Sequence, residues 1–187
     1  MDHTALLLID LQRDLLEADG RMPVSAADAS QVVSGANRLI QHGASAGWKL
    51  IFIKNEYPRS DFVANFFRKG AAIEDSHGAE LDPRVIVPSS GLVLTKSRPD
   101  AFSNPKLEET LASGAVHRLV VLGVMAEGCV RATVNGAISR GFTVTVVSDA
   151  VASTRGLFRR FGMRSMKNAG ATAKVSSEIL GLHPSPP

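Results

Sequence analysis

Short, continuous apolar runs recur along the chain and are separated by segments with helical periodicity. Five runs are candidate strands, at residues 5–9, 50–53, 92–95, 119–122 and 144–147, and residues 173–176 are a weaker candidate. An unbroken apolar run is typical of a strand that is buried on both faces of a sheet. Segments with helical periodicity lie at residues 28–44, 104–113, 129–140 and 156–169. Strands that alternate with helices predict an α/β fold with a parallel sheet between two layers of helices.

The boundaries of these helices carry recognisable signals. Asn104 and Pro105 are typical of an N-cap and the first helical position, and Gly141 and Gly170 lie where helix C-caps are expected. A chain of 187 residues is long enough for one domain, so we expect a single domain over residues 1–187.

Composition narrows the class of protein. Hydrophobic residues make up 44% and charged residues 21%, which excludes a disordered chain, a collagen-like chain and a coiled coil. The net charge of +3 gives little support for binding to nucleic acid or to a membrane, and no apolar run approaches the roughly 20 residues that span a bilayer. A single cysteine excludes an internal disulfide and fits a reducing compartment. The first residues lack the features of a signal peptide, so we expect a cytoplasmic protein.

Polar side chains follow several of the apolar runs. Asp10 follows the first run, Lys96 follows the third, and Cys129 opens the helical segment after the fourth; Asn55 and Asp149 follow two others. Open parallel sheets hold their sites at the carboxyl ends of the strands. If these strands are neighbours, a carboxylate, an ammonium and a thiol converge at one edge.

Each of these three groups suits nucleophilic catalysis. The positive field at a helix N-terminus lowers the pKa of a thiol, so we expect Cys129 to be rich in thiolate. The Asp10 carboxylate is suited to take the thiol proton, and the Lys96 ammonium to favour the thiolate. Taken singly, each residue also has an ordinary interpretation: a small buried thiol, a loop-bracing carboxylate and an exposed lysine.

Four stretches together resemble a known family. Residues 7–12, 96–102, 123–130 and 141–153 are similar, in order and spacing, to motifs of the isochorismatase-like cysteine hydrolases. The resemblance extends from about residue 4 to residue 180. It implies a three-layer α/β/α, Rossmann-like fold around a six-stranded, mainly parallel sheet, and a homo-oligomer such as a dimer or tetramer.

The resemblance also implies a catalytic triad of Asp10, Lys96 and Cys129. In such enzymes the aspartate takes the thiol proton, the cysteine attacks a carbonyl carbon, an amine or ammonia leaves, and water hydrolyses the thioester. A cis peptide bond between Val124 and Met125 would turn the N–H of Met125 toward the site. That N–H and the N–H of Cys129 would then form the oxyanion hole.

The chain departs from the nicotinamidases of this superfamily, which bind a metal through an Asp-x-His pair and a further histidine. The matching residues are Asn55, Glu56 and Tyr57, and His77 lacks those partners. We therefore expect no catalytic metal. No phosphate-binding or dinucleotide-binding glycine motif is complete, so we expect no cofactor.

Three hypotheses of function follow. The presence of Cys129 favours cleavage of a C–N bond in a small amide, ureide or carbamoyl compound. A vinyl-ether hydrolase of the isochorismatase type, with Cys129 as a bystander, is the second hypothesis. A non-enzymatic interaction protein on the same fold is the third.

Further side chains are candidates for the substrate pocket. Gln12, Tyr57 and Phe102 each neighbour a site-bearing strand end, so we expect them to contact substrate. Glu127 is a candidate to orient a substrate amine, or to favour the helix start electrostatically.

The remaining patterns concern the surface. Residues 155–174 carry six basic side chains and no acidic one, which indicates a solvated helix face more strongly than an anionic partner or a subunit contact. Leu157, Phe158 and Phe161 are expected to pack inward. The phenylalanines at 62, 66 and 67 are candidates either to line a pocket or to anchor a loop to the core or to a second subunit.

Overall fold

The computed structural model describes residues 3–182, apart from the side chain of Ala64. Its six-stranded sheet has the strand order β3-β2-β1-β4-β5-β6, and every pair of neighbours is parallel. The strands are β1 (Thr4–Ile9), β2 (Lys49–Asn55), β3 (Leu92–Lys96), β4 (Arg118–Gly123), β5 (Thr143–Val151) and β6 (Thr172–Lys174). The expected three-layer α/β/α fold is confirmed, with a sheet that is parallel throughout.

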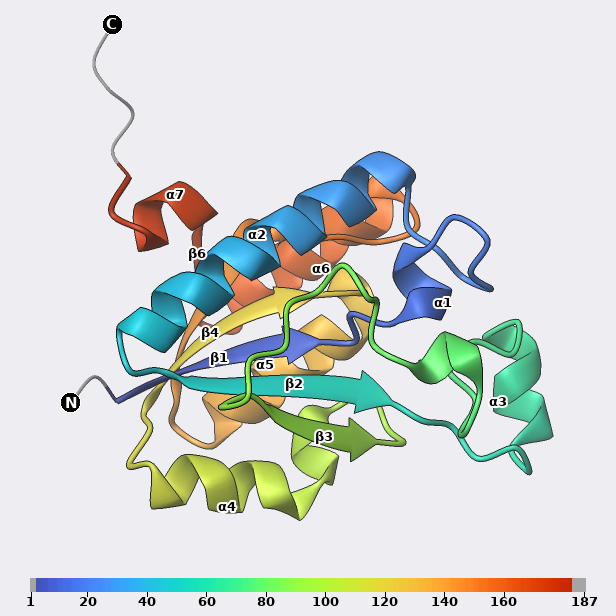
Figure 1. Ribbon diagram of the computed structural model, residues 1–187, viewed down its shortest axis with the longest axis horizontal. Coiled ribbons are helices and arrows are strands. Elements are labelled where there is room, and N and C mark those ends of the chain that lie inside the picture. Colours follow the sequence, from blue (N-terminus) through green and yellow to red (C-terminus); the bar gives the residue numbers. More distant parts are fainter. Residues whose placement is uncertain (1–2, 183–187) are drawn as a thin grey trace, which may run out of the picture.

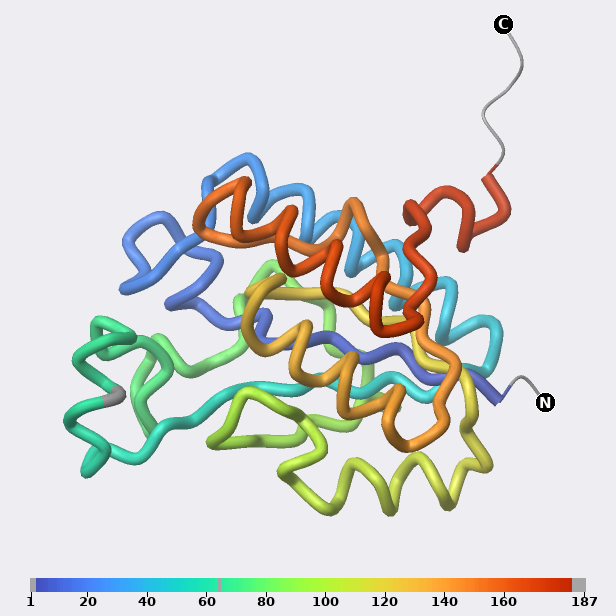
Figure 2. The backbone as a smooth tube through the Cα atoms, turned by 180° about the vertical axis from the view of Figure 1, so that it is seen from behind, coloured from blue at the N-terminus to red at the C-terminus, as the bar shows by residue number. Residues whose placement is uncertain are grey.

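Helices cover both faces of this sheet. Figure 1 shows α2 in front of the sheet, and Figure 2, seen from behind, shows α4, α5 and α6 on the opposite face. The helices are α1 (Arg13–Leu16), α2 (Ala26–Ser45), α3 (Phe62–Phe67), α4 (Pro105–Ser113), α5 (Arg131–Ser139), α6 (Gly156–Asn168) and α7 (Ser176–Ile179), and short turns are η1 (His77–Ala79), η2 (Ala101–Ser103) and η3 (Ala126–Val130). No helix within residues 3–182 is long and apolar enough to cross a membrane.

Two hydrophobic cores lie on the two faces of the sheet, and β1 contributes to both. Leu6 and Leu8 pack into the core beneath α2. Ala5, Leu7 and Ile9 pack into the core beneath α4, α5 and α6. Because both faces of β1 are buried, the strand has no solvent-facing position, which explains its unbroken apolar run.

The helix boundaries follow the signals in the sequence. The Asn104 side chain accepts a hydrogen bond from the N–H of Lys106 over 3.0 Å, and Pro105 occupies the first turn of α4. Gly141 and Gly170 follow α5 and α6 with φ angles of +83° and +113°, a region of the backbone that favours glycine. All three predicted helix boundaries are therefore confirmed.

The expectation that α6 packs inward through its large apolar residues is wrong. Leu157, Phe158 and Phe161 are 75%, 44% and 61% exposed. The buried face of α6 is instead formed by Gly162 and Met166. A glycine there lets the helix approach its neighbours closely, and that approach fixes which face turns inward.

The phenylalanines of α3 are also exposed. Phe62, Phe66 and Phe67 are each 78–80% exposed, and α3 lies beyond the carboxyl ends of the strands (Figure 1). They anchor neither to the core nor within a pocket of this chain. Contact with a second subunit stays a prediction.

Candidate active site

Asp10, Lys96 and Cys129 meet at the carboxyl ends of β1, β3 and β4. The Lys96 Nζ donates a hydrogen bond to Asp10 Oδ2 over 3.1 Å, and both side chains are fully buried. Asp10 and Cys129 both border one cavity. The structure therefore brings together the three residues that the sequence singled out.

Asn55 joins this group, a role that the sequence analysis did not assign. Its Nδ2 donates to Asp10 Oδ2 over 2.6 Å and to Cys129 Sγ over 3.3 Å. Asn55 ends β2, which lies between β1 and β3, and it is in register with Lys96. The available signal was the same as for Asp10 and Lys96, because Asn55 is a polar residue at the end of an apolar run.

The Asp10 carboxyl group is held in an unusual electrostatic setting. Complete burial raises its pKa, although Lys96, Cys129 and Asn55 each act to lower that pKa. Oδ2 accepts the hydrogen bonds from Lys96 and Asn55, whereas Oδ1 is buried and has no hydrogen-bond partner among the described residues. Oδ1 is therefore available to accept a proton.

The expectation of a lowered thiol pKa is wrong. Burial and the negative charge of Asp10 raise the pKa of Cys129 to about 12, and the opposing effects of Lys96 and Asn55 are smaller. The turn that carries Cys129, η3, is five residues long and is interrupted by non-helical backbone at Gly128, so it supplies little of the field of a regular helix. At neutral pH the sulfur keeps its proton until a base removes it.

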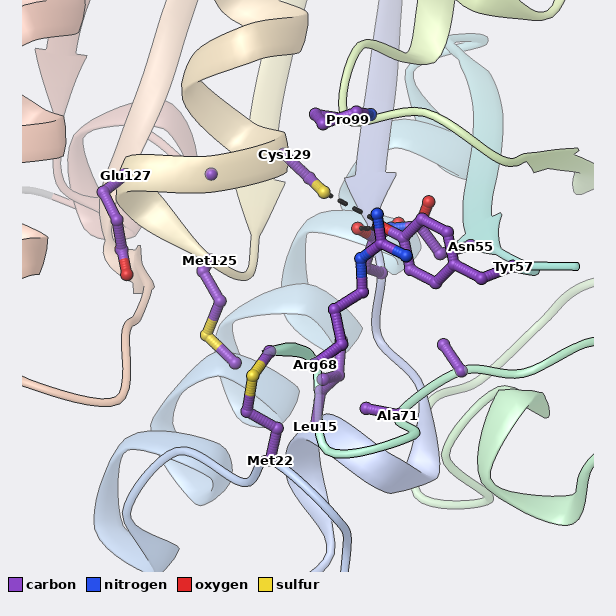
Figure 3. A pocket seen from close by; sticks show the side chains of 13 residues that line it. Leu15, Met22, Asn55, Tyr57, Arg68, Ala71, Pro99, Met125, Glu127 and Cys129 are labelled. Carbon is purple, nitrogen blue, oxygen red and sulfur yellow. Dashed lines mark hydrogen bonds between the residues drawn. The ribbon is translucent and has the colours of Figure 1, made fainter. Parts of the chain in front are cut away.

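The cavity in front of the sulfur has a volume of about 270 Å³, the size of a small-molecule site. Figure 3 shows its side chains converging from the strand ends, α1 and the chain between β2 and η1. Its apolar lining is Leu15, Met22, Ala71, Ala72, Pro99 and Met125, and the rest is Asp10, Asn55, Tyr57, Arg68, Glu127, Gly128 and Cys129. Most of the wall is apolar. Asn55, Tyr57 and Arg68 lie on the side of the sulfur, whereas Glu127 lies beyond Met125.

Tyr57 and Glu127, two of the predicted substrate-contacting residues, line this cavity. Burial and the charges of Cys129 and Asp10 raise the pKa of Tyr57, so its hydroxyl stays protonated and can donate to the sulfur. The guanidinium of Arg68 lies over the Tyr57 ring, 3.5 Å from its centroid. One carboxylate oxygen of Glu127 is buried without a hydrogen-bond partner among the described residues.

Gln12 does not line the cavity, contrary to expectation. It is fully buried, its Nε2 donates to the carbonyl oxygens of Asn55 and Ala79 over 2.7 and 2.8 Å, and its Oε1 accepts from the N–H of Asn55 over 2.8 Å. Because the sequence identifies a polar residue but not its partners, Gln12 looked like a substrate contact. Its position fixes the backbone of Asn55.

Phe102 does not line the cavity either. It is buried, its ring lies 5.9 Å from that of Phe142, and the Arg140 guanidinium lies 4.5 Å from its centroid. Phe102 belongs to η2 and not to the strand end itself. Its ring therefore packs against these neighbours and not into the cavity.

The backbone beside Cys129 has the expected form. The Val124–Met125 peptide bond is cis, and both Met125 and Cys129 line the cavity. The assignment of their N–H groups as an oxyanion hole stays a prediction.

The residues in the place of the nicotinamidase metal ligands do not fit a metal. An asparagine amide, whose Nδ2 donates to Asp10 and Cys129, and a tyrosine beneath Arg68 stand where those enzymes have an aspartate and a histidine. His77 is exposed and pairs with Glu80 over 3.1 Å. Within residues 3–182, no group of three histidine, cysteine, aspartate or glutamate side chains is placed to hold a metal ion.

Residues 4–177 match the family described as the isochorismatase domain. A protein of Arabidopsis thaliana described as a "probable inactive nicotinamidase" is 29% identical over 186 residues, which cover 94% of each chain. N-carbamoylsarcosine amidase of an Arthrobacter species is 26% identical over 138 residues, which cover 69% of this chain and 52% of that protein. The pyrazinamidase of Pyrococcus horikoshii, solved in complex with zinc, has a TM-score of 0.83 at 24% identity and covers 92% of this chain and 99% of that chain.

Proposed function

The chain belongs to the isochorismatase family, and we propose that it hydrolyses a carbon–nitrogen bond in a small amide, ureide or carbamoyl compound. The observation that carries this proposal is the hydrogen-bonded group of Asp10, Asn55 and Cys129, backed by Lys96, in the wall of a small cavity. The similarity to N-carbamoylsarcosine amidase supports the same bond type.

The first half of the reaction forms a thioester. As the sulfur of Cys129 bonds to the substrate carbonyl carbon, Asp10 Oδ1 takes the thiol proton, and Lys96 stabilises the carboxylate before that transfer. The N–H groups of Met125 and Cys129 bind the carbonyl oxygen as it becomes negative. Asp10 then gives the proton to the leaving nitrogen, the C–N bond breaks, and ammonia or an amine departs.

The second half restores the thiol. Water attacks the thioester carbonyl carbon while Asp10 accepts one of its protons. The C–S bond breaks, the acid product leaves, and Asp10 returns the proton to the sulfur. The raised pKa of Asp10 makes its carboxylate a stronger base, and the raised pKa of Cys129 keeps the proton on the sulfur until the attack on the substrate.

Loss of the sulfur tests this proposal. Cys129→Ser is expected to abolish ammonia release across a panel of small amides, ureides and lactams that the unaltered protein turns over. Mass spectrometry of rapidly quenched reactions is expected to show an acyl adduct on Cys129, the single cysteine. Full activity in the serine variant would refute the nucleophile.

Chelation tests the independence from metal. A chelator is expected to leave ammonia release unchanged, because asparagine and tyrosine occupy the positions of the aspartate and histidine ligands. Activity that is lost with the chelator and restored by zinc or iron would contradict this. Hydrolysis of a vinyl ether to a ketone, with no turnover of the nitrogen compounds, would favour the vinyl-ether reaction.

We also propose that the protein is a cytoplasmic homo-oligomer. A reducing compartment keeps the Cys129 thiol free for catalysis. The exposed apolar side chains of α3 and α6 support self-association, because such patches commonly mark interfaces. Sedimentation velocity is expected to show a dimer or tetramer. The Leu157→Glu variant is expected to form a smaller species. A monomer of the unaltered protein at all concentrations would refute this.

A further inference from the structure

We propose that the substrate carries a carboxylate group and that Arg68 binds it, an inference that rests on the proposed function. Arg68 belongs to the chain between β2 and η1, which leaves the sheet after Asn55, forms α3 and returns to the cavity. Arg68 therefore reaches the cavity from a segment that carries no part of the triad.

The guanidinium of Arg68 is held in the cavity wall with hydrogen-bonding capacity to spare. Its side chain is 27% exposed, and Nη1 is buried without a hydrogen-bond partner among the described residues. Its ion pair with Asp61 is long, with 3.9 Å between Nη1 and Oδ2. A buried donor that lacks a partner is unfavourable, so a ligand acceptor at this position would stabilise it.

The stacking on Tyr57 fixes where such a ligand would lie. The guanidinium carbon is 3.5 Å from the centroid of the Tyr57 ring. The Tyr57 hydroxyl in turn neighbours Cys129, whose charge raises the pKa of that hydroxyl. The Tyr57 ring thus lies between the Arg68 guanidinium and the Cys129 sulfur. Figure 3 shows Arg68 extending across the cavity toward Tyr57 and Asn55. A carboxylate held there would lie only a few bonds from the carbon that the sulfur attacks.

The other charges of the cavity leave this end open to an anion. Asp10 is compensated by the buried ammonium of Lys96. Glu127 is separated from Arg68 in Figure 3, with Met125 between them. Arg68 is the one cationic side chain among the described residues that line the cavity.

Arginine is well suited to this task, because its planar guanidinium can donate two parallel hydrogen bonds to one carboxylate. The negative charge of Glu127 at the far side disfavours the reverse orientation of the ligand. Arg68 and Glu127 together favour binding of a ureido acid or an N-acyl amino acid over a neutral amide of the same size.

Alkylation of the single cysteine tests Arg68 without knowledge of the substrate. Iodoacetate and iodoacetamide alkylate a thiol in the same way and differ in carrying a carboxylate or a neutral amide. The unaltered protein is expected to react with iodoacetate with a rate that saturates as its concentration rises. Arg68→Gln is expected to lower the ratio of the iodoacetate rate to the iodoacetamide rate about 10- to 100-fold.

Matched variants separate this effect from general loss of charge or of fold. Arg59→Gln, at an exposed residue of the same segment, is expected to keep the ratio, and Arg68→Lys to give an intermediate one. The iodoacetamide rate reports whether Cys129 is reactive and folded, and thereby tests the proposed nucleophile separately. An unchanged ratio in Arg68→Gln would overturn the assignment.

A binding measurement covers the case of an unreactive thiol. Calorimetric titration of Cys129→Ser with N-carbamoylglycine is expected to show binding, and its neutral amide to bind at least about tenfold more weakly. Adding Arg68→Gln is expected to remove that difference. Equal affinities for acid and amide in the Cys129→Ser protein would refute the carboxylate site.

Discussion

Replacing Lys96 with methionine would leave Asp10 as a buried carboxylate without its cation. Both side chains are fully buried, and 3.1 Å separates Lys96 Nζ from Asp10 Oδ2. Methionine keeps most of the length of the lysine stem and packs as an apolar residue. Removal of one partner from a buried ion pair costs about 3–5 kcal/mol of unfolding free energy, because the remaining charge is uncompensated.

This loss depends on pH. The pKa of Asp10 in the folded protein is already raised by burial, so the folded state binds its proton more tightly than the unfolded state does. A group of this kind destabilises the fold as pH rises from its unfolded pKa through its folded pKa. Lys96→Met removes a charge that lowers this pKa, so the variant loses stability over a wider range of pH. At acidic pH the carboxyl is neutral, and the wild type then holds an ammonium without a charged partner, so the difference shrinks.

Urea denaturation followed by the fluorescence of Trp48, the single tryptophan, measures this effect between pH 4.5 and pH 9. The stability difference between wild type and Lys96→Met is expected to grow with pH and to approach the full value in the alkaline range. Asp10→Asn added to Lys96→Met is expected to recover most of it. A loss that is equal at both ends of the range, or a double variant no more stable than Lys96→Met, would refute the reasoning.

Three further predictions concern neighbouring features. Asn55→Leu removes the N–H that reaches both Asp10 and the sulfur, so initial rates of ammonia release are expected to fall about 10- to 100-fold; undiminished rates would contradict this. A Cβ at Gly162 would lie 2.4 Å from the carbonyl oxygen of Ala126, so Gly162→Ala is expected to lower Tm by roughly 2–10 °C in a calorimetric scan. Gly156 has open space around it, so Gly156→Ala is expected to leave Tm nearly unchanged. Because the pKa of Cys129 is about 12, its alkylation by iodoacetamide is expected to rise about tenfold per pH unit between pH 7 and pH 10, and a plateau below pH 9 would count against it.

The sheet and the long helices could be predicted because their signals are local. An unbroken apolar run marks each buried strand, and helical periodicity marks α2, α4, α5 and α6. The helices α1, α3 and α7 have four to six residues each, too few for a periodic pattern. The inward face of α6 was mistaken because it depends on the close contact at Gly162, not on the apolar residues of the helix.

The site residues at strand ends could be predicted from the sequence. The residues that reach the cavity from the long connection between β2 and η1 could not. Asp10 and Lys96 follow from the rule for parallel sheets, and the family resemblance added their roles. The sequence could not show that Arg68 turns into the cavity while Arg59 remains exposed, because that choice is made by tertiary packing. The thiol pKa was predicted in the wrong direction because burial beside Asp10 outweighs the local field of a short turn.

Most of the cavity wall comes from two kinds of chain segment, and Leu15, Met22 and Pro99 complete it from elsewhere. Asp10, Asn55 and Cys129 stand on strand ends and on η3, whereas Tyr57, Arg68, Ala71 and Ala72 all come from one continuous stretch between β2 and η1. No residue after Cys129 is among the described residues that line it. Grafting a different stretch into residues 57–72 would therefore change one wall of the cavity while the strand ends and the sheet stay as they are.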